Sequence, residues 1–158
     1  SFKMTQEILS KIQAKAGITQ TQIDAAEEGE IINCCMIIRN NNYSEEAFYE
    51  RKDIKYVVAK NLTVVSVHMF RQCSNLELIY APNVVLMEDG NLETKDNLVE
   101  KNIGTFSETA LTNICFPKLL YAGVLSFFLC QSAIAVDLPH CLKIADYAFQ
   151  FCSKITTL

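Results

Sequence analysis

Seven cysteines and two histidines are the residues in this sequence that could support nucleophilic or zinc chemistry. A cysteine nucleophile needs a base beside it, and the histidine bases on offer are His68 and His140. These two lie in unrelated parts of the chain, neither is placed beside a cysteine in a repeating way, and we expect both at the surface. Cys34 and Cys35 are adjacent, but no C-x-x-C pair with a nearby histidine gives the spacing of a zinc site. The sequence therefore predicts no catalytic residue, no metal site and no cofactor.

The sequence also gives little support for a phosphate-binding or a cation-binding site. The five glycines are scattered along the chain, so no glycine-rich phosphate loop is formed. An acidic stretch at 88–100 carries five carboxylates against one lysine, yet it lacks the ordered spacing of a calcium loop. This stretch is typical of a solvated loop, with a binding loop as the alternative. The net charge of −4 and the lack of a lysine and arginine cluster argue against a nucleic-acid partner.

Three of the cysteines belong to a sequence repeat whose period is the step from Phe48 to Phe70. Phenylalanine recurs at one position of this repeat, and three residues later a second position holds Cys73, Cys130 and Cys152, with Arg51 and Glu108 in the other copies. From their recurrence we interpret these cysteines as a buried ladder of small apolar side chains, and we expect them to be reduced thiols. The recurring phenylalanines are Phe48, Phe70, Phe127 and Phe149.

Other positions of the repeat agree. One is apolar in every copy, and another holds proline at Pro82, Pro117 and Pro139. The spacing from Cys73 to Glu108 is 35, which is one period of 22 plus an insertion of 13. A fixed period of this size predicts a solenoid, because each unit must stack on its neighbours to bury its apolar face.

The pattern F-x-x-C-x-x-L-x-x-I-x-x-P, which runs from Phe70 to Pro82, resembles the BspA-like class of leucine-rich repeat. The resemblance covers roughly residues 47–158. It departs at Thr105 and Glu108, where phenylalanine and cysteine are expected, and Phe106 is a candidate for the displaced phenylalanine. The resemblance implies a leucine-rich repeat solenoid, either an α/β-type horseshoe or a right-handed solenoid, with short parallel strands.

Two domains follow. Residues 1–25 are predicted to be a helical N-terminal cap, with a helix at Met4–Ala16 that ends at Gly17 and covers the exposed end of the first coil. Residues 26–158 are the solenoid, interrupted by the insertion at about 88–100. A degenerate first coil is expected to contribute a strand at Ile31–Arg39. The later coils should contain strands at Lys55–Ala59, Glu77–Ala81, Thr112–Phe116 and Ala135–Leu138, each ending near the proline position.

Alternation along these strands separates an inner from an outer, concave face. Since exposed aromatic and aliphatic side chains gathered on one face mark interaction sites, the outer face predicts a non-enzymatic module that binds a protein partner. BspA-like relatives include surface adhesins that bind host proteins, and the resemblance allows that function here. The predicted partner-binding residues are Tyr56, Val58, Leu78, Tyr80, Asn113, Cys115 and Asp137.

The alternative function is a structural or assembly unit. The sequence stops inside a repeat, with no polar element to cover Phe151, Ile155 and Leu158. Solenoids cover such ends with caps, so this end is expected either to self-associate as a homodimer, which is favoured, or to have its last coil frayed. A fragment of a larger BspA-like adhesin is the remaining possibility.

The longest uncharged run, residues 119–136, has the length of a membrane span. Its apolar residues stay in phase with the repeat, so it is predicted to be solenoid core and not a span. Residues 1–20 lack the continuous apolar stretch of a secretion signal, which predicts a cytoplasmic protein. A cell-surface or secreted protein is expected instead if the native N-terminus has been removed.

Overall fold

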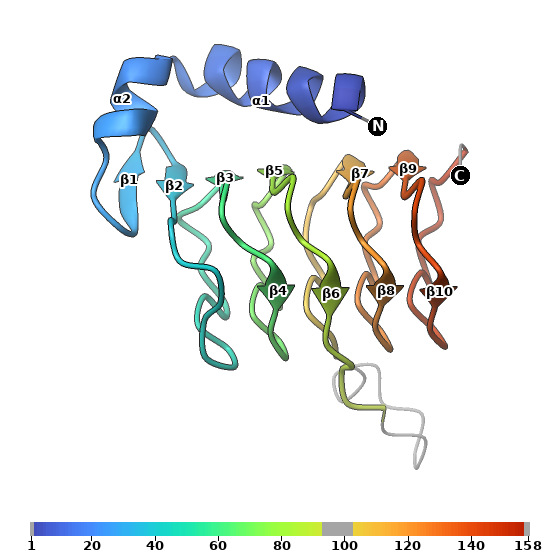
Figure 1. Ribbon diagram of the computed structural model, residues 1–158. Helices are drawn as coiled ribbons and strands as arrows, with labels where there is room; N and C mark the ends of the chain where they lie inside the picture. Colours follow the sequence, from blue (N-terminus) through green and yellow to red (C-terminus); the bar gives the residue numbers. More distant parts are fainter. Residues whose placement is uncertain (1, 93–102, 157–158) are drawn as a thin grey trace.

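The computed structural model describes residues 2–92 and 103–156 as a β-solenoid of short coils with a helix along one side (Figure 1). Two helices come first, α1 at Phe2–Ala16 and α2 at Gln20–Ala25. Ten short strands follow within the described residues. They are β1 (Glu30–Ile32), β2 (Cys35–Ile37), β3 (Tyr56–Val58), β4 (Val64–Val65), β5 (Leu78–Tyr80), β6 (Leu86–Met87), β7 (Asn113–Cys115), β8 (Tyr121–Ala122), β9 (Ala135–Asp137) and β10 (Lys143–Ile144).

One side of the solenoid is formed by β2, β3, β5, β7 and β9 in parallel. Tyr56 pairs with Leu78 and Asn113 with Ala135, in each case at the spacing of one repeat. The hydrogen-bonded ladder is interrupted between β5 and β7, although the two strands lie side by side (Figure 1). Each strand predicted for a later coil contains the strand that is observed, so the solenoid with parallel strands is confirmed.

A second parallel sheet, β4-β6-β8-β10, forms another side and was not predicted as strands. It uses residues of the repeat that follow the proline position. Val65, Met87 and Ala122 point inward from it and are fully buried. Two-residue strands carry too little periodicity to be recognised from sequence, but the stacking of coils supplies their hydrogen bonds.

A third side consists of turns around a column of stacked phenylalanine rings. The rings of Phe48, Phe70, Phe106, Phe127 and Phe149 follow one another with centroid separations of 5.5, 5.2, 5.4 and 5.0 Å. Backbone N–H groups along the column donate to the coil that follows, as from Phe70 to the Thr105 carbonyl at 2.8 Å. Phe106 therefore is the displaced phenylalanine.

The register around the insertion differs from the prediction at the cysteine position. Thr109, and not Glu108, occupies it, because the Thr109 hydroxyl lies 3.4 Å from the sulfur of Cys130 in the next coil. The insertion lengthens the chain ahead of Phe106, and one residue fewer separates Thr109 from Leu111 than separates Cys73 from Leu76. The coil therefore has extra residues before Phe106 and one residue fewer after it. Together these two changes give the net insertion of 13 residues.

The N-terminal region also differs from the prediction. Ile31–Arg39 is not one strand: β1 and β2 form an antiparallel hairpin, with Asn33 and Cys34 at positive φ in its turn. Met36 pairs with Val57, one residue short of the repeat spacing, and this slip exchanges the two faces of β2 relative to the prediction. The hairpin covers the edge of the first coil, while α1 lies across the outer face of β3, β5 and β7 (Figure 1).

Candidate protein-binding surfaces

The predicted partner-binding face lies beneath helix α1. Five of its seven residues, Tyr56, Val58, Leu78, Tyr80 and Cys115, are buried, each with 9% or less of its surface exposed. They share an apolar cluster with Ile8 and Ile12 of the helix. The prediction that these side chains are exposed is therefore wrong, because sequence alternation distinguishes the two faces of a strand but does not show what covers the second.

Polar contacts fix α1 on this face as well. The Thr5 hydroxyl lies 3.3 Å from the sulfur of Cys115, and the Gln6 amide donates to the Tyr80 hydroxyl at 3.5 Å. Lys15 is 3.6 Å from a carboxylate oxygen of Glu77 at the surface. Asn33 of the hairpin turn donates to the last helical carbonyl, that of Ala16, at 2.9 Å. The helix is thus tied to β5, β7 and the hairpin by separate contacts.

Asn113 and Asp137, the other two predicted residues, are half-buried at the far end of the sheet. The Cys115 thiol lies 3.7 Å from a carboxylate oxygen of Asp137. These two residues are the part of the predicted face that keeps contact with solvent. Whether any of the seven contributes to partner binding stays a prediction.

Exposed apolar side chains gather instead in the last coil, residues 134–156. Phe151, predicted for self-association, is 53% exposed, and Leu142 is 84% exposed. Ile155 is half-buried, and Leu158 lies outside the described residues. In the described part of the chain, β10 pairs only with β8 and has a free edge, whereas the chain beyond β9 follows its outer edge, with the Thr156 N–H donating to the Ile134 carbonyl at 3.0 Å. The exposed large apolar residues of this coil are Ile134, Leu142, Ile144, Tyr147 and Phe151.

Four of those five residues were missed by sequence reasoning. Leu142 extends a column formed by Val85 and Leu120, which are 37% and 46% exposed on the second sheet's side. The step from Leu120 to Leu142 is one period of the repeat, and the step from Val85 to Leu120 is one period plus the insertion. This signal was present in the sequence, but an apolar residue at a repeating position is normally interpreted as core.

The match to a known protein family covers the whole chain. A family model described as BspA type leucine-rich repeat region (6 copies) matches residues 1–89 and 90–158. The chain belongs to this family. No curated protein and no solved structure shows significant similarity to it.

Membership of the BspA-type family identifies the chain as a repeat module of a protein-interaction or adhesin-like class, which is typically non-enzymatic. Among the residues that the structure describes, no helix is long and apolar enough to cross a membrane. The uncharged run at 119–136 forms strands and turns of the solenoid.

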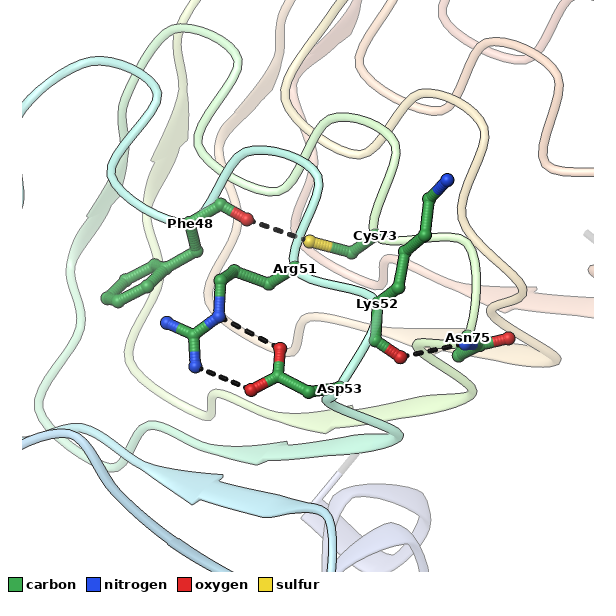
Figure 2. A network of polar contacts seen from close by, with 6 residues as sticks. All are labelled: Phe48, Arg51, Lys52, Asp53, Cys73 and Asn75. Carbon is green, nitrogen blue, oxygen red and sulfur yellow. Dashed lines mark hydrogen bonds and ion pairs between the residues drawn. The ribbon is translucent and has the colours of Figure 1, made fainter.

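Thiols of this BspA-type repeat serve its packing. Cys73 donates to the carbonyl of Phe48 in the previous coil at 3.0 Å, and Cys130 and Cys152 donate to Phe106 and Phe127 at 3.2 and 3.1 Å (Figure 2 shows the first). All seven cysteines are thiols and not halves of a disulfide. Burial raises the pKa of the Cys73 thiol to about 11. A thiol that keeps its proton is a poor nucleophile, which fits a structural role.

Arg51 shows what happens where the cysteine is missing. Its guanidinium turns to the surface and donates to both carboxylate oxygens of Asp53, at 2.9 and 2.8 Å (Figure 2). This hydrogen bonding lowers the pKa of Asp53. Asn75 of the next coil donates to the carbonyl of Lys52 at 2.7 Å, so the turns are joined by side chains as well as backbone.

His68 was predicted at the surface and is in fact buried, with 4% of its surface exposed. Its Nδ1 lies 3.7 Å from a carboxylate oxygen of Glu46, and its Nε2 has no hydrogen-bond partner within the described residues. Burial lowers the pKa of His68. His68 lies in the turns that surround the phenylalanine column, and its backbone φ is 54°. His140 is exposed, as predicted.

The base of the acidic insertion is anchored by hydrogen bonds. Asp89 accepts from the Tyr121 hydroxyl at 2.6 Å and from the Val124 N–H at 2.9 Å, and these bonds lower its pKa. Residues 93–102 of the insertion lie outside the described part. Within residues 2–92 and 103–156 no three histidine, cysteine or acidic side chains are grouped as metal ligands would be.

Proposed function

We propose that this BspA-type repeat is a non-enzymatic protein-interaction module whose last coil binds a second copy of the chain. A module of this kind needs an exposed surface with apolar side chains that can be removed from water on association. The last coil offers one, since it carries five of the nine large apolar side chains that are exposed in the described residues.

The concentration of exposed apolar groups beside the free edge of β10 is the observation that carries this proposal. Phe127 and Phe149 stack at 5.0 Å, and Phe149 is only partly buried because nothing in the described structure stacks on its other side. A strand edge presents unpaired N–H and C=O groups that another edge can satisfy. Two copies meeting at this coil would cover the ring of Phe149 and the edge of β10.

Light scattering over a dilution series tests the proposal. We expect the mass to fall from dimer to monomer on dilution, and the Phe151→Glu variant to stay monomeric at all concentrations. Val85→Glu is the matched control, because Val85 is also exposed and apolar but lies away from the last coil. A monomer at every concentration, or equal effects of the two variants, would contradict the proposal.

The same surface would accept a following coil if the chain were a piece of a larger BspA-like adhesin. The gene sequence beyond residue 158 tests this, since further coils in phase with the repeat would be found there.

Partner binding through the outer face of β3 and β5 is a second candidate function, and it requires α1 to move aside. The face beneath the helix is favoured by its composition, because Tyr56, Leu78 and Tyr80 form one apolar surface there. Cys115 reports on this motion, since it is 2% exposed at the same interface. If α1 leaves the sheet, a maleimide should label Cys115 in the native protein faster than Cys73 in the core. Equal rates would argue against this candidate.

A further inference from the structure

A groove runs beside α1, along the turns that follow the strands of the first sheet. It consists of two hollows of about 400 and 460 Å³ that share Gln6, Lys60 and Tyr80. The helix forms one wall, through Thr5 and Gln6, and the turns form the other. The mostly buried ring of Tyr80 lies at the place where the two hollows meet.

The larger hollow is cationic although the chain carries a net charge of −4. Its lining includes Lys60, Lys118 and His140 and contains no aspartate or glutamate. Lys118 donates to the side-chain oxygen of Asn83 at 2.8 Å, which uses one of its three donors. Neither lysine forms an ion pair with a carboxylate in the part of the chain that the structure describes.

Prolines reduce the number of backbone donors that the turns offer. Pro82, Pro117 and Pro139 line the larger hollow in successive coils, and proline has no N–H. Asn83 already donates to the carbonyl of Lys60 at 2.7 Å. A ligand here would therefore be recognised by charge and by packing on proline and tyrosine, and not by pairing as an added strand.

The distance between Lys60 and Lys118 determines the distance between the two negative charges of a ligand that could bind both. Lys60 follows β3 and Lys118 follows β7, two coils further along. At about 4.8 Å between neighbouring strands, the two turns are roughly 10 Å apart. An extended segment in the polyproline II conformation rises about 3.1 Å per residue with three residues per turn, so acidic side chains three positions apart lie on one face and about 9 Å apart.

We propose that this groove binds an extended acidic protein segment in which two carboxylates are three residues apart. The charge of the lining selects an anionic ligand, and its proline and tyrosine surface accommodates the two apolar residues between the carboxylates. Both lysines lie outside the last coil, although Pro139 and His140 of the lining belong to it, and the site rests on the proposed function only in the assignment of the chain as a protein-binding module.

Fluorescence anisotropy with a labelled peptide, Gly-Glu-Leu-Pro-Glu-Gly, tests the proposal. We expect saturable binding that weakens as salt is raised from 50 to 300 mM, and at least about tenfold weaker binding of the peptide with both Glu changed to Gln. Reversing Lys60 and Lys118 together, Lys60→Glu and Lys118→Glu, should weaken binding of the Glu peptide by a similar factor. The milder pair Lys60→Gln and Lys118→Gln should give an intermediate loss.

Lys52→Glu with Lys55→Glu is the matched control, because both lysines are exposed and lie outside the groove. This pair makes the same change in net charge and should leave affinity within about twofold of the original protein. Equal affinity for the Glu and Gln peptides, or equal losses in the two charge-reversed pairs, would overturn the proposal. Light scattering of the Lys60 and Lys118 variants should show unchanged self-association, so failure of this site is distinguishable from failure of the last coil.

Discussion

Single residues of the aromatic column show how each coil is held to the next. Phe70 is fully buried and stacks on Phe48 and Phe106, with its ring at 22° and 9° to theirs. Stacked aromatic pairs contribute about 0.5–1.5 kcal/mol beyond the apolar area that they bury. Removing one ring from the middle of the column therefore costs two such contacts and leaves a cavity.

Phe70→Ala is expected to lower the free energy of unfolding by about 3–5 kcal/mol, as loss of a buried ring usually does. Urea unfolding followed by circular dichroism measures it. Phe149→Ala should cost less, because Phe149 is only partly buried. Phe151→Ala is the control and should change the free energy of unfolding of the monomer by less than about 1 kcal/mol, since that ring is 53% exposed. Similar losses at all three positions would contradict the stacked column.

Cys73 makes stability depend on pH in the alkaline range. Burial raises the pKa of its thiol from 9.0 to about 11, so the folded protein keeps a proton that the unfolded chain releases. The stabilisation is fully present below pH 9 and is lost as the pH rises to 11.

We expect the free energy of unfolding to fall between pH 9 and 10, with Cys73 contributing at most about 1.4 kcal/mol per pH unit. Urea unfolding at both pH values should show a smaller decrease for Cys73→Ala than for the original protein. Cys34→Ala serves as the comparison, because Cys34 is exposed. An unchanged pH dependence in Cys73→Ala would show that this thiol does not titrate as its burial requires.

At the scale of elements, α1 closes the first sheet. Ile8 and Ile12 lie on its buried face at a spacing of four residues, which places them one turn apart against Tyr56, Leu78 and Tyr80. Capping of the neighbouring helix is local: Thr19 and Gln22 form a reciprocal capping box at the start of α2. The docking of α1, in contrast, depends on residues from separate coils.

A disulfide can test this docking directly. Because the Thr5 oxygen lies 3.3 Å from the sulfur of Cys115, the Thr5→Cys variant should form a bridge to Cys115 on oxidation. The bridge should stabilise the protein by about 2–4 kcal/mol, measured by thermal unfolding with and without reductant. Thr5→Ser should show no dependence on reductant. Failure to find the linked peptides by mass spectrometry would show that α1 does not lie on β7 as described.

For the whole molecule, stability should decrease toward the last coil. In a solenoid each coil is stabilised by its neighbours, and a terminal coil has one neighbour fewer. The inner coils are fully buried along the phenylalanine column, whereas the last coil holds exposed Leu142 and half-buried Ile155.

Hydrogen exchange at monomer concentrations should therefore show a gradient. The N–H of Phe127, which donates to Ala148 of the last coil at 2.8 Å, should exchange faster than that of Phe70, which donates to Thr105 at 2.8 Å. Raising the concentration should slow exchange at Phe127 if the last coil self-associates. Uniform protection along the column would show that the solenoid opens only as one unit.

The sequence alone determined the repeat, because stacked coils need the same side chain at the same position of every turn. Phe70, Cys73 and Pro82 therefore predicted the aromatic column, the buried thiols and the ends of the first-sheet strands. It also allowed Phe106 to be recognised as displaced. The position of Thr109 was missed because a one-residue deletion hides in a loop whose length varies freely.

The tertiary structure decided what covers each face. Alternation showed that Tyr56 and Tyr80 point away from the solenoid core, but solvent and a packed helix both lie in that direction. Only the path of the chain through Gly17 and α2 brings Ile12 back onto these tyrosines. For the same reason the groove beside α1 and the exposed surface of the last coil became visible only in three dimensions, where residues from separate coils meet.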